Sequence, residues 1–163
     1  MQVAFEARQA SQPFRHRDIA EGVTPRESNP DQLFCRFRGR DAISEATDAA
    51  RAFGKSHWLA DDELARLCIV VEELVANLYD HGGLSAQDEI ELALACNSDG
   101  IHLSIFDPGA PFDPWAAAPR AHRPNRGGGA GIDLVRAWAK LISYRSSSDG
   151  NRLDILLAVR REG

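Results

Sequence analysis

Acidic, amide and imidazole side chains gather in the stretch EELVANLYDHGG, residues 72–83. Glu73 and Asn77 are four residues apart, which puts them on one face of a helix, in the same stripe as Asp80. A carboxylate takes a proton from a hydroxyl, and an amide oxygen ligates a hard cation such as Mg²⁺. No lysine or arginine occurs from Leu67 to His81. Two interpretations therefore stand side by side, a lined cleft and a partly exposed polar helix face.

A second candidate site is FDPGAPFDPW, residues 106–115. Asp107 falls at the expected end of a strand, where its carboxylate accepts a hydrogen bond from an exocyclic amine such as that of adenine. Gly109 lacks a side chain, so a flat ring can approach the backbone there. Taken alone, the stretch is more typical of an ordinary turn.

The third candidate is NRGGGAGIDLV, residues 125–135, a glycine run that opens a helix. Such a start offers free N–H groups and the positive end of the helix dipole to a phosphate. It is not a P-loop, because no Gly-Lys-Ser/Thr follows, and no βαβ unit surrounds it as a dinucleotide site requires. Arg120, Arg123 and Arg126 precede it. A flexible hinge and a solvated basic loop are the alternatives.

Hydrophobic periodicity predicts the elements that position these stretches. Strands are expected at 33–39, 89–96, 101–107, 142–148 and 152–159, and helices at about 41–54, 61–81 and 130–142, with a long loop from about 108 to 128. Antiparallel hairpins with helices on one face make an α+β fold, a two-layer α/β sandwich. We expect one domain over 31–163, preceded by an extension at 1–30.

Composition restricts the classes of function. The chain has 163 residues, of which 44% are hydrophobic and 26% charged, with a net charge of −5 that does not favour direct nucleic-acid binding. Its three cysteines fit neither a zinc site nor a disulfide framework. No apolar run approaches the roughly 20 residues that span a bilayer, and the start has no apolar signal-peptide core. We expect a cytoplasmic protein without a membrane partner.

The order of these stretches resembles the GHKL ATP-binding family, whose fold is the Bergerat-type sandwich. Within it, the chain is most similar to the anti-sigma-factor serine/threonine kinases of bacterial partner-switching systems. The resemblance covers about residues 33–160. EELVANLYDHG resembles the N box, DPGAPFDP the first glycine box and RGGGAGIDLV the second. Ala130 and Ile132 stand where the family prefers leucines, but both keep the small apolar pattern.

The resemblance implies a role for each matching residue. Glu73 would be the general base, Asn77 the Mg²⁺ ligand and Asp107 the adenine hook, while Gly109 would shape the base pocket. The arginine-bearing loop would close over the triphosphate. The nucleotide-binding set would also include His81, Phe112, Arg126, Gly128, Gly129, Ala130, Gly131 and Ile132.

The implied activity is protein phosphorylation with ATP and Mg²⁺. The substrate in this branch is an anti-anti-sigma factor with a STAS domain, and the other partner is often a sigma factor. The sequence does not decide whether the chain forms a homodimer. One alternative is a binding module that has lost catalysis and acts by sequestering a partner. Another is the ATP-binding domain of a histidine kinase, which needs a phospho-acceptor helix pair upstream. A gyrase- or chaperone-like ATPase would need a second domain.

Overall fold

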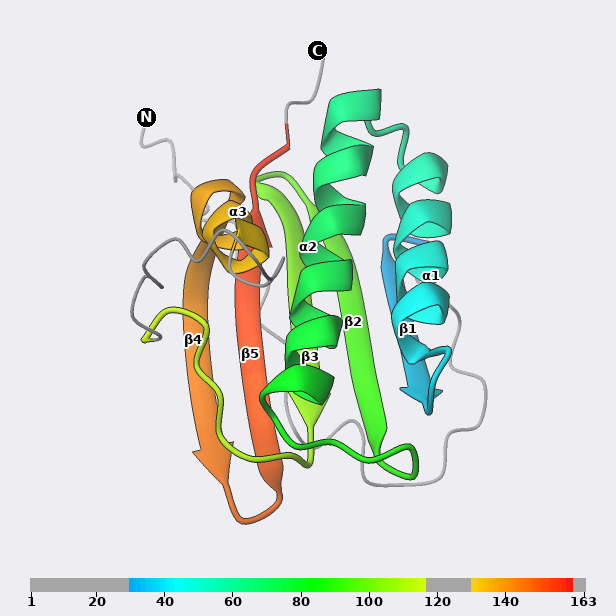
Figure 1. Ribbon diagram of the computed structural model, residues 1–163. Coiled ribbons are helices and arrows are strands. Elements are labelled where there is room, and N and C mark those ends of the chain that lie inside the picture. Colours follow the sequence, from blue (N-terminus) through cyan, green and yellow to red (C-terminus); the bar gives the residue numbers. More distant parts are fainter. Residues whose placement is uncertain (1–29, 117–129, 160–163) are drawn as a thin grey trace, which may run out of the picture.

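The structure is a computed structural model that describes residues 30–116 and 130–159. Nearly all of the expected extension, the loop arginines Arg120, Arg123 and Arg126, and the glycines Gly128 and Gly129 lie outside these residues. The elements, coloured along the chain in Figure 1, are β1 (Gln32–Arg38), α1 (Ala42–Ser56), α2 (Asp61–Asp80), β2 (Glu89–Asn97), β3 (Gly100–Asp107), α3 (Ala130–Trp138), β4 (Ala139–Ser147) and β5 (Gly150–Leu157).

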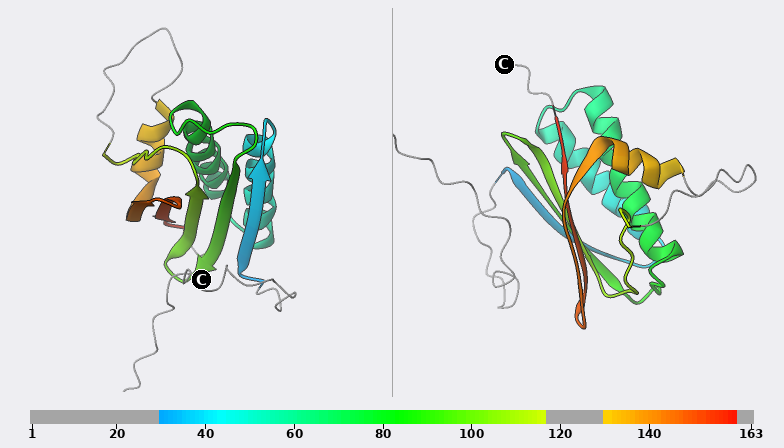
Figure 2. Two further views of the ribbon diagram at one scale, coloured as in Figure 1. Left: turned by 90° about the horizontal axis from the view of Figure 1, so that it is seen from below. Right: turned by 90° about the vertical axis from the view of Figure 1, so that its left-hand side faces the viewer.

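The strands form one antiparallel sheet in the order β1-β2-β3-β5-β4. All three helices cover the same face of this sheet, with α2 between α1 and α3 (Figures 1 and 2). The predicted α+β sandwich with helices on one face is therefore confirmed. In the part of the chain that the structure describes, no helix is both long and apolar enough to cross a bilayer.

The core lies between the sheet and the inner face of α2. Alternate residues of the central strands point toward the helices and are buried, and on the other face of β2 and β3 the small residues Ala93, Ala95 and Ser104 are buried as well. Apolar residues of α2 at helical spacing meet the residues that point toward the helices. The largest of these buried side chains are Leu67, Val70, Val71, Val75, Ile90, Leu92, Leu94, Ile101, Leu103, Ile155 and Leu157.

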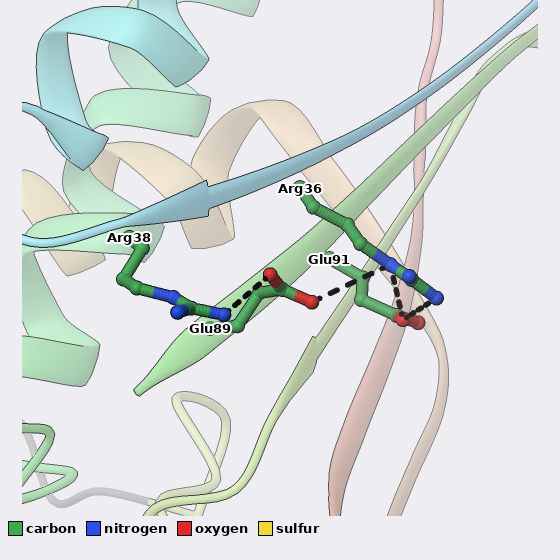
Figure 3. A network of polar contacts seen from close by, with 4 residues as sticks. All are labelled: Arg36, Arg38, Glu89 and Glu91. Atoms are coloured by element: carbon green, nitrogen blue, oxygen red, sulfur yellow. Dashed lines mark hydrogen bonds and ion pairs between the residues drawn. The ribbon is translucent and has the colours of Figure 1, made fainter. Parts of the chain in front are cut away.

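The other face of the sheet is charged at the β1–β2 edge. Arg36 contacts Glu91 at 2.8 Å and Glu89 at 3.5 Å, and Arg38 contacts Glu89 at 3.0 Å (Figure 3). These are cross-strand pairs of opposite charge, since Arg36 lies opposite Glu91 and Arg38 opposite Glu89. They are suited to a face that meets water.

The third helix is shorter than predicted. It ends at Trp138 instead of continuing to Ile142, and β4 begins at once with Ala139. The residues Ala139 and Leu141 have an apolar periodicity that also suits a strand, and pairing with Leu157 and Ile155 of β5 decides between the two.

Candidate functional site

Helix α2 carries Glu73 and Asn77 on its half-buried flank. The side-chain Nδ2 of Asn77 donates a hydrogen bond to the backbone carbonyl of Glu73, four residues earlier, at 2.5 Å. The helix ends at the next turn, where the N–H groups of His81 and Gly82 donate to the carbonyl of Asn77 at 2.9 and 3.3 Å. The Asn77 amide nitrogen is thus engaged with the helix, and its oxygen is the atom type that ligates Mg²⁺.

The carboxylate of Glu73 lies against the start of α3. A Cβ atom on Gly131 would overlap this carboxylate, so the backbone of α3 approaches it as closely as glycine allows. Burial raises the pKa of Glu73, and the nearby acids Glu72 and Asp80 raise it further. At Glu73 the flank of α2 is therefore packed against α3 and only partly exposed.

Asp107, at the end of β3, is only 4% exposed. Its Oδ1 accepts two hydrogen bonds, from the N–H of Gly109 at 2.9 Å and from Nδ2 of Asn151 at 3.1 Å. Burial raises the pKa of Asp107, and these two bonds act against the rise. Asn151 also donates to the carbonyls of Gly109 and Ala110, at 2.9 and 3.3 Å, so it joins the carboxylate to the segment that follows it.

A small pocket opens over Asp107. Its walls are apolar and aromatic, and the carboxylate is its one ionisable group besides a tyrosine. The chemistry of these walls and this acceptor suits a flat heteroaromatic ring with an exocyclic amine, and the cavity, about 10 Å³ in volume, must widen to admit one. The pocket is lined by Leu74, Leu78, Ile105, Asp107, Phe112, Pro114, Tyr144 and Leu153.

The segment 108–116 crosses this pocket and is fixed at several points. The N–H of Ala110 donates to the carbonyl of Gly82 at 2.7 Å, and the N–H of Phe112 donates to the hydroxyl of Tyr144 at 2.9 Å. Farther along, the guanidinium of Arg136 on α3 donates to the carbonyl of Pro114, from Nε at 2.8 Å and from Nη2 at 2.5 Å. The segment is thereby held to α2, β4 and α3.

Gly109 has a packing reason to be glycine. A Cβ atom there would lie 2.5 Å from the carbonyl oxygen of Gly82 and 2.9 Å from a methyl carbon of Leu84. The neighbour that excludes a side chain is therefore the end of α2. This close approach joins the first glycine box to the N box.

The family model of the histidine kinase-like ATPase domain matches residues 39–157. The chain belongs to the histidine kinase-like ATPase family. A crystal structure of the RsbU and RsbW domains of Rv1364c from Mycobacterium tuberculosis is similar, with a TM-score of 0.54 and 16% identity over 80% of this chain and 33% of that one. At that identity the likeness concerns the fold alone, and the present chain spans about a third of the other. No curated protein sequence matches the chain.

The structure of this histidine kinase-like ATPase brings several of the predicted residues together. Glu73 meets Gly131, while Asp107 and Phe112 line the same pocket. The ring of His81 lies 5.4 Å from that of Phe112, centroid to centroid. The remaining predicted residues are less informative: Ile132 is half-buried against the core, Ala130 begins α3, and Arg126, Gly128 and Gly129 lie outside the described residues.

Asn151 contacts Asp107 and Tyr144 lines the pocket, yet neither stands out in the sequence. Asn151 shares the inward face of β5 with Leu153 and Ile155, and a lone amide among inward aliphatics is a signal of a buried polar contact. Tyr144 is harder to find, because an irregularity in β4 between Leu141 and Ser143 reverses the alternation just before it.

The described residues hold no group of three or more histidines, cysteines or acids able to bind a metal on their own. Mg²⁺ does not require such a group, since it commonly keeps several waters and shares its coordination with substrate phosphates. One amide oxygen on the flank of α2, beside a carboxylate, fits that mode of binding.

Proposed function

We propose that this histidine kinase-like ATPase is a serine/threonine protein kinase and anti-sigma factor of a bacterial partner-switching system. Its substrates would be ATP and a serine or threonine of an anti-anti-sigma protein with a STAS domain. The observation that carries the proposal is the position of Glu73, which is half-buried, has a raised pKa and lies one helical turn from Asn77. A chain that only bound nucleotide would not need a base at this place.

The chemistry assigned to these residues is a single displacement. The hydroxyl oxygen of the substrate forms a bond to the γ-phosphorus of ATP, the bond to the bridging oxygen of ADP breaks, and the hydroxyl proton passes to Glu73. Phosphoryl transfer depends on positioning and charge neutralisation more than on covalent chemistry. A carboxylate with a raised pKa is a better proton acceptor than an ordinary one while it remains ionised near neutral pH.

The pocket residues would position the nucleotide. Asp107 would accept a hydrogen bond from the adenine amine, and the aliphatic walls from α2, β3 and β5 would enclose the ring. Asn77 would contribute its amide oxygen to Mg²⁺. When bound, that ion neutralises charge on the phosphate oxygens. Gly131 and the glycines before it would face the phosphates, as the resemblance implies.

The decisive experiment measures phosphate transfer from ATP to purified STAS-domain proteins. We expect wild-type chain to phosphorylate one of them with Mg²⁺ present, and Glu73→Gln to bind ATP but transfer phosphate at least about 100-fold more slowly. Glu45→Gln, at an exposed acid on α1, is the matched control and keeps the wild-type rate.

Two results would overturn the proposal. If the Glu73→Gln variant transfers phosphate at the wild-type rate, Glu73 is not the general base. Tight binding of a STAS protein or a sigma factor without any transfer by the wild-type chain would instead make it a sequestering module.

A further inference from the structure

Trp58, in the loop between α1 and α2, is exposed in an unusual backbone conformation. Its side chain is 92% exposed, and its φ is +56°, which makes it the sole non-glycine residue with positive φ in the described part of the chain. Left-handed backbone is unfavourable for a bulky residue, and so is an indole surrounded by water. Because both features are unfavourable for the folded chain alone, a binding role for Trp58 would explain them.

The local hydrogen bonds show that the loop does not need this residue. The N–H of Trp58 donates to the carbonyl of Lys55 at 3.2 Å, and the N–H of Leu59 donates to that of Gly54 at 3.1 Å, which together form a Schellman motif. Glycine is the usual residue at the left-handed position. Leu59, and not Trp58, supplies the apolar contact with the core. Glycine at this position would therefore support the same loop, and the indole is not needed for folding.

The loop leads directly into the outer face of α2. Asp62, Ala65, Ile69, Glu73 and Ala76 recur at helical spacing on this face, and all of them are exposed or half-buried. Between the first acid and Glu73 the face is apolar. The buried residues of α2 lie on the opposite side of the helix, so this stripe faces away from the sheet. Helix α2 itself lies between α1 and α3 (Figure 1). Trp58 lies three residues before the start of α2, and the proposed base Glu73 lies in this stripe.

The distance from Trp58 to Glu73 fits a single protein interface. Glu73 lies twelve residues beyond Asp61, or about 18 Å along the helix axis. The three residues from Trp58 to Asp61 add roughly 10 Å at most. A standard interface of about 800 Å² on each partner is roughly 30 Å across. A partner held at Trp58 therefore reaches Glu73.

The charge of α2 indicates what the partner surface is like. Exposed acids stand at both ends of the helix, Asp61 and Asp62 at its start and Asp80 at its end, whereas Arg66, its one basic residue, pairs with Asp62 at 3.2 Å. The nucleotide phosphates would add more negative charge. Complementarity therefore favours a partner whose surface around the contact is basic.

We infer that the outer face of α2 docks the protein substrate, with Trp58 as its anchor. The substrate then carries an apolar pocket for the indole and a basic surface around its serine or threonine. Tryptophan is enriched among the few residues that carry most of the binding energy of an interface. The inference rests on the proposed function, and it names the surface by which that function recognises its substrate.

The test compares Trp58→Gly with wild type, using the STAS-domain protein that accepts phosphate in the assay above. Glycine suits the left-handed backbone, so the variant folds. We expect its affinity for the STAS protein to fall at least about 30-fold and the KM for that protein to rise correspondingly, while the KM for ATP stays within about twofold. Binding of the wild-type chain should weaken as salt rises.

The control variant is Phe34→Ala, which removes an aromatic residue that is 47% exposed on the opposite face of the sheet. It should leave both KM values unchanged. Equal binding by wild type and Trp58→Gly, with phosphate transfer intact, overturns the docking surface and leaves the kinase standing. A change in oligomeric state of Trp58→Gly at unchanged substrate affinity would assign Trp58 to a contact between copies. If the wild type neither binds nor phosphorylates any STAS protein, function and surface fail together.

Discussion

Replacing Gly131 by alanine should separate catalysis from folding. The added Cβ atom would lie 2.5 Å from Oε1 of Glu73 and closer still to Cδ and Oε2, whereas ordinary contact begins near 3.4 Å. The Glu73 carboxylate is the far end of a flexible side chain, so it moves in preference to the backbone of α3. The required displacement is on the order of 1 Å or more.

This geometry predicts a large loss of transfer rate and little change in the free energy of unfolding. A misplacement of about 1 Å in a catalytic group costs on the order of 100-fold in rate, or about 2.7 kcal/mol of barrier. Alanine is a better helix former than glycine by up to about 1 kcal/mol, so the free energy of unfolding should stay level or rise slightly. We expect the Gly131→Ala variant to be as stable as wild type and to transfer phosphate more slowly.

The assay combines urea unfolding, ATP binding and transfer to the STAS protein at saturating ATP. If Gly131 acts through Glu73, the rate at saturation falls while ATP affinity changes only a few-fold. In a Glu73→Ala background the Gly131 change should have no further effect on the residual rate, because the two residues act as one unit. An unchanged rate at saturation, with weaker ATP binding, would show that Gly131 serves the phosphates alone and would refute the coupling to the base.

Three further predictions concern Glu73 and Asp107, the two carboxyl groups whose pKa is raised. The transfer rate should fall as pH drops through the raised pKa of Glu73, because only the ionised form accepts the proton, so the acid limb lies above the ordinary value of about 4.3; a pH–rate profile with its limb at or below that value would contradict this. Asp107→Asn should weaken the preference for ATP over GTP in a competition assay, because an amide also donates to a guanine carbonyl. In the nucleotide-free chain it should also stabilise the fold at neutral pH, an advantage that fades as pH falls through the raised pKa of Asp107; urea unfolding at two pH values would reveal a loss of stability if this is wrong.

The fold was predictable because its elements show strong periodicity. The strands at Glu89–Asn97 and Gly100–Asp107 follow alternation, and α2 follows an apolar stripe with glycines after it. The ends of helices and strands were less predictable where the same residues fit both the helical and the strand periodicity. Ala139–Leu141 continues the pattern of α3, yet it is a strand because the ladder with β5 outweighs local helix propensity.

The residues of the candidate site could be proposed from the sequence where they lie close together in the chain. Glu73, Asn77 and Asp107 lie in motifs whose spacing is fixed by one helix or one strand end. Asn151 reaches Asp107 across 44 residues, and Arg136 reaches the carbonyl of Pro114 across 22. Such long-range contacts depend on strand order and helix packing, which local periodicity does not encode.

Four acids in the described chain have shifted pKa values, and the direction of the shift separates them. Hydrogen bonds from the backbone and side chain of Ser85 lower the pKa of Asp88. Burial acts to raise the pKa of Asp154, but hydrogen bonds from serine and arginine side chains outweigh it and lower the pKa. Burial raises the pKa of both Glu73 and Asp107. For Glu73 the neighbouring acids Glu72 and Asp80 add to the rise, and for Asp107 burial outweighs the hydrogen bonds from Asn151 and Gly109. A raised carboxyl pKa costs stability at neutral pH, which folding alone gives no reason to accept. A substrate hydroxyl and an adenine amine are donors, so the two acids that the fold stabilises least are the two that the proposed substrates would stabilise most.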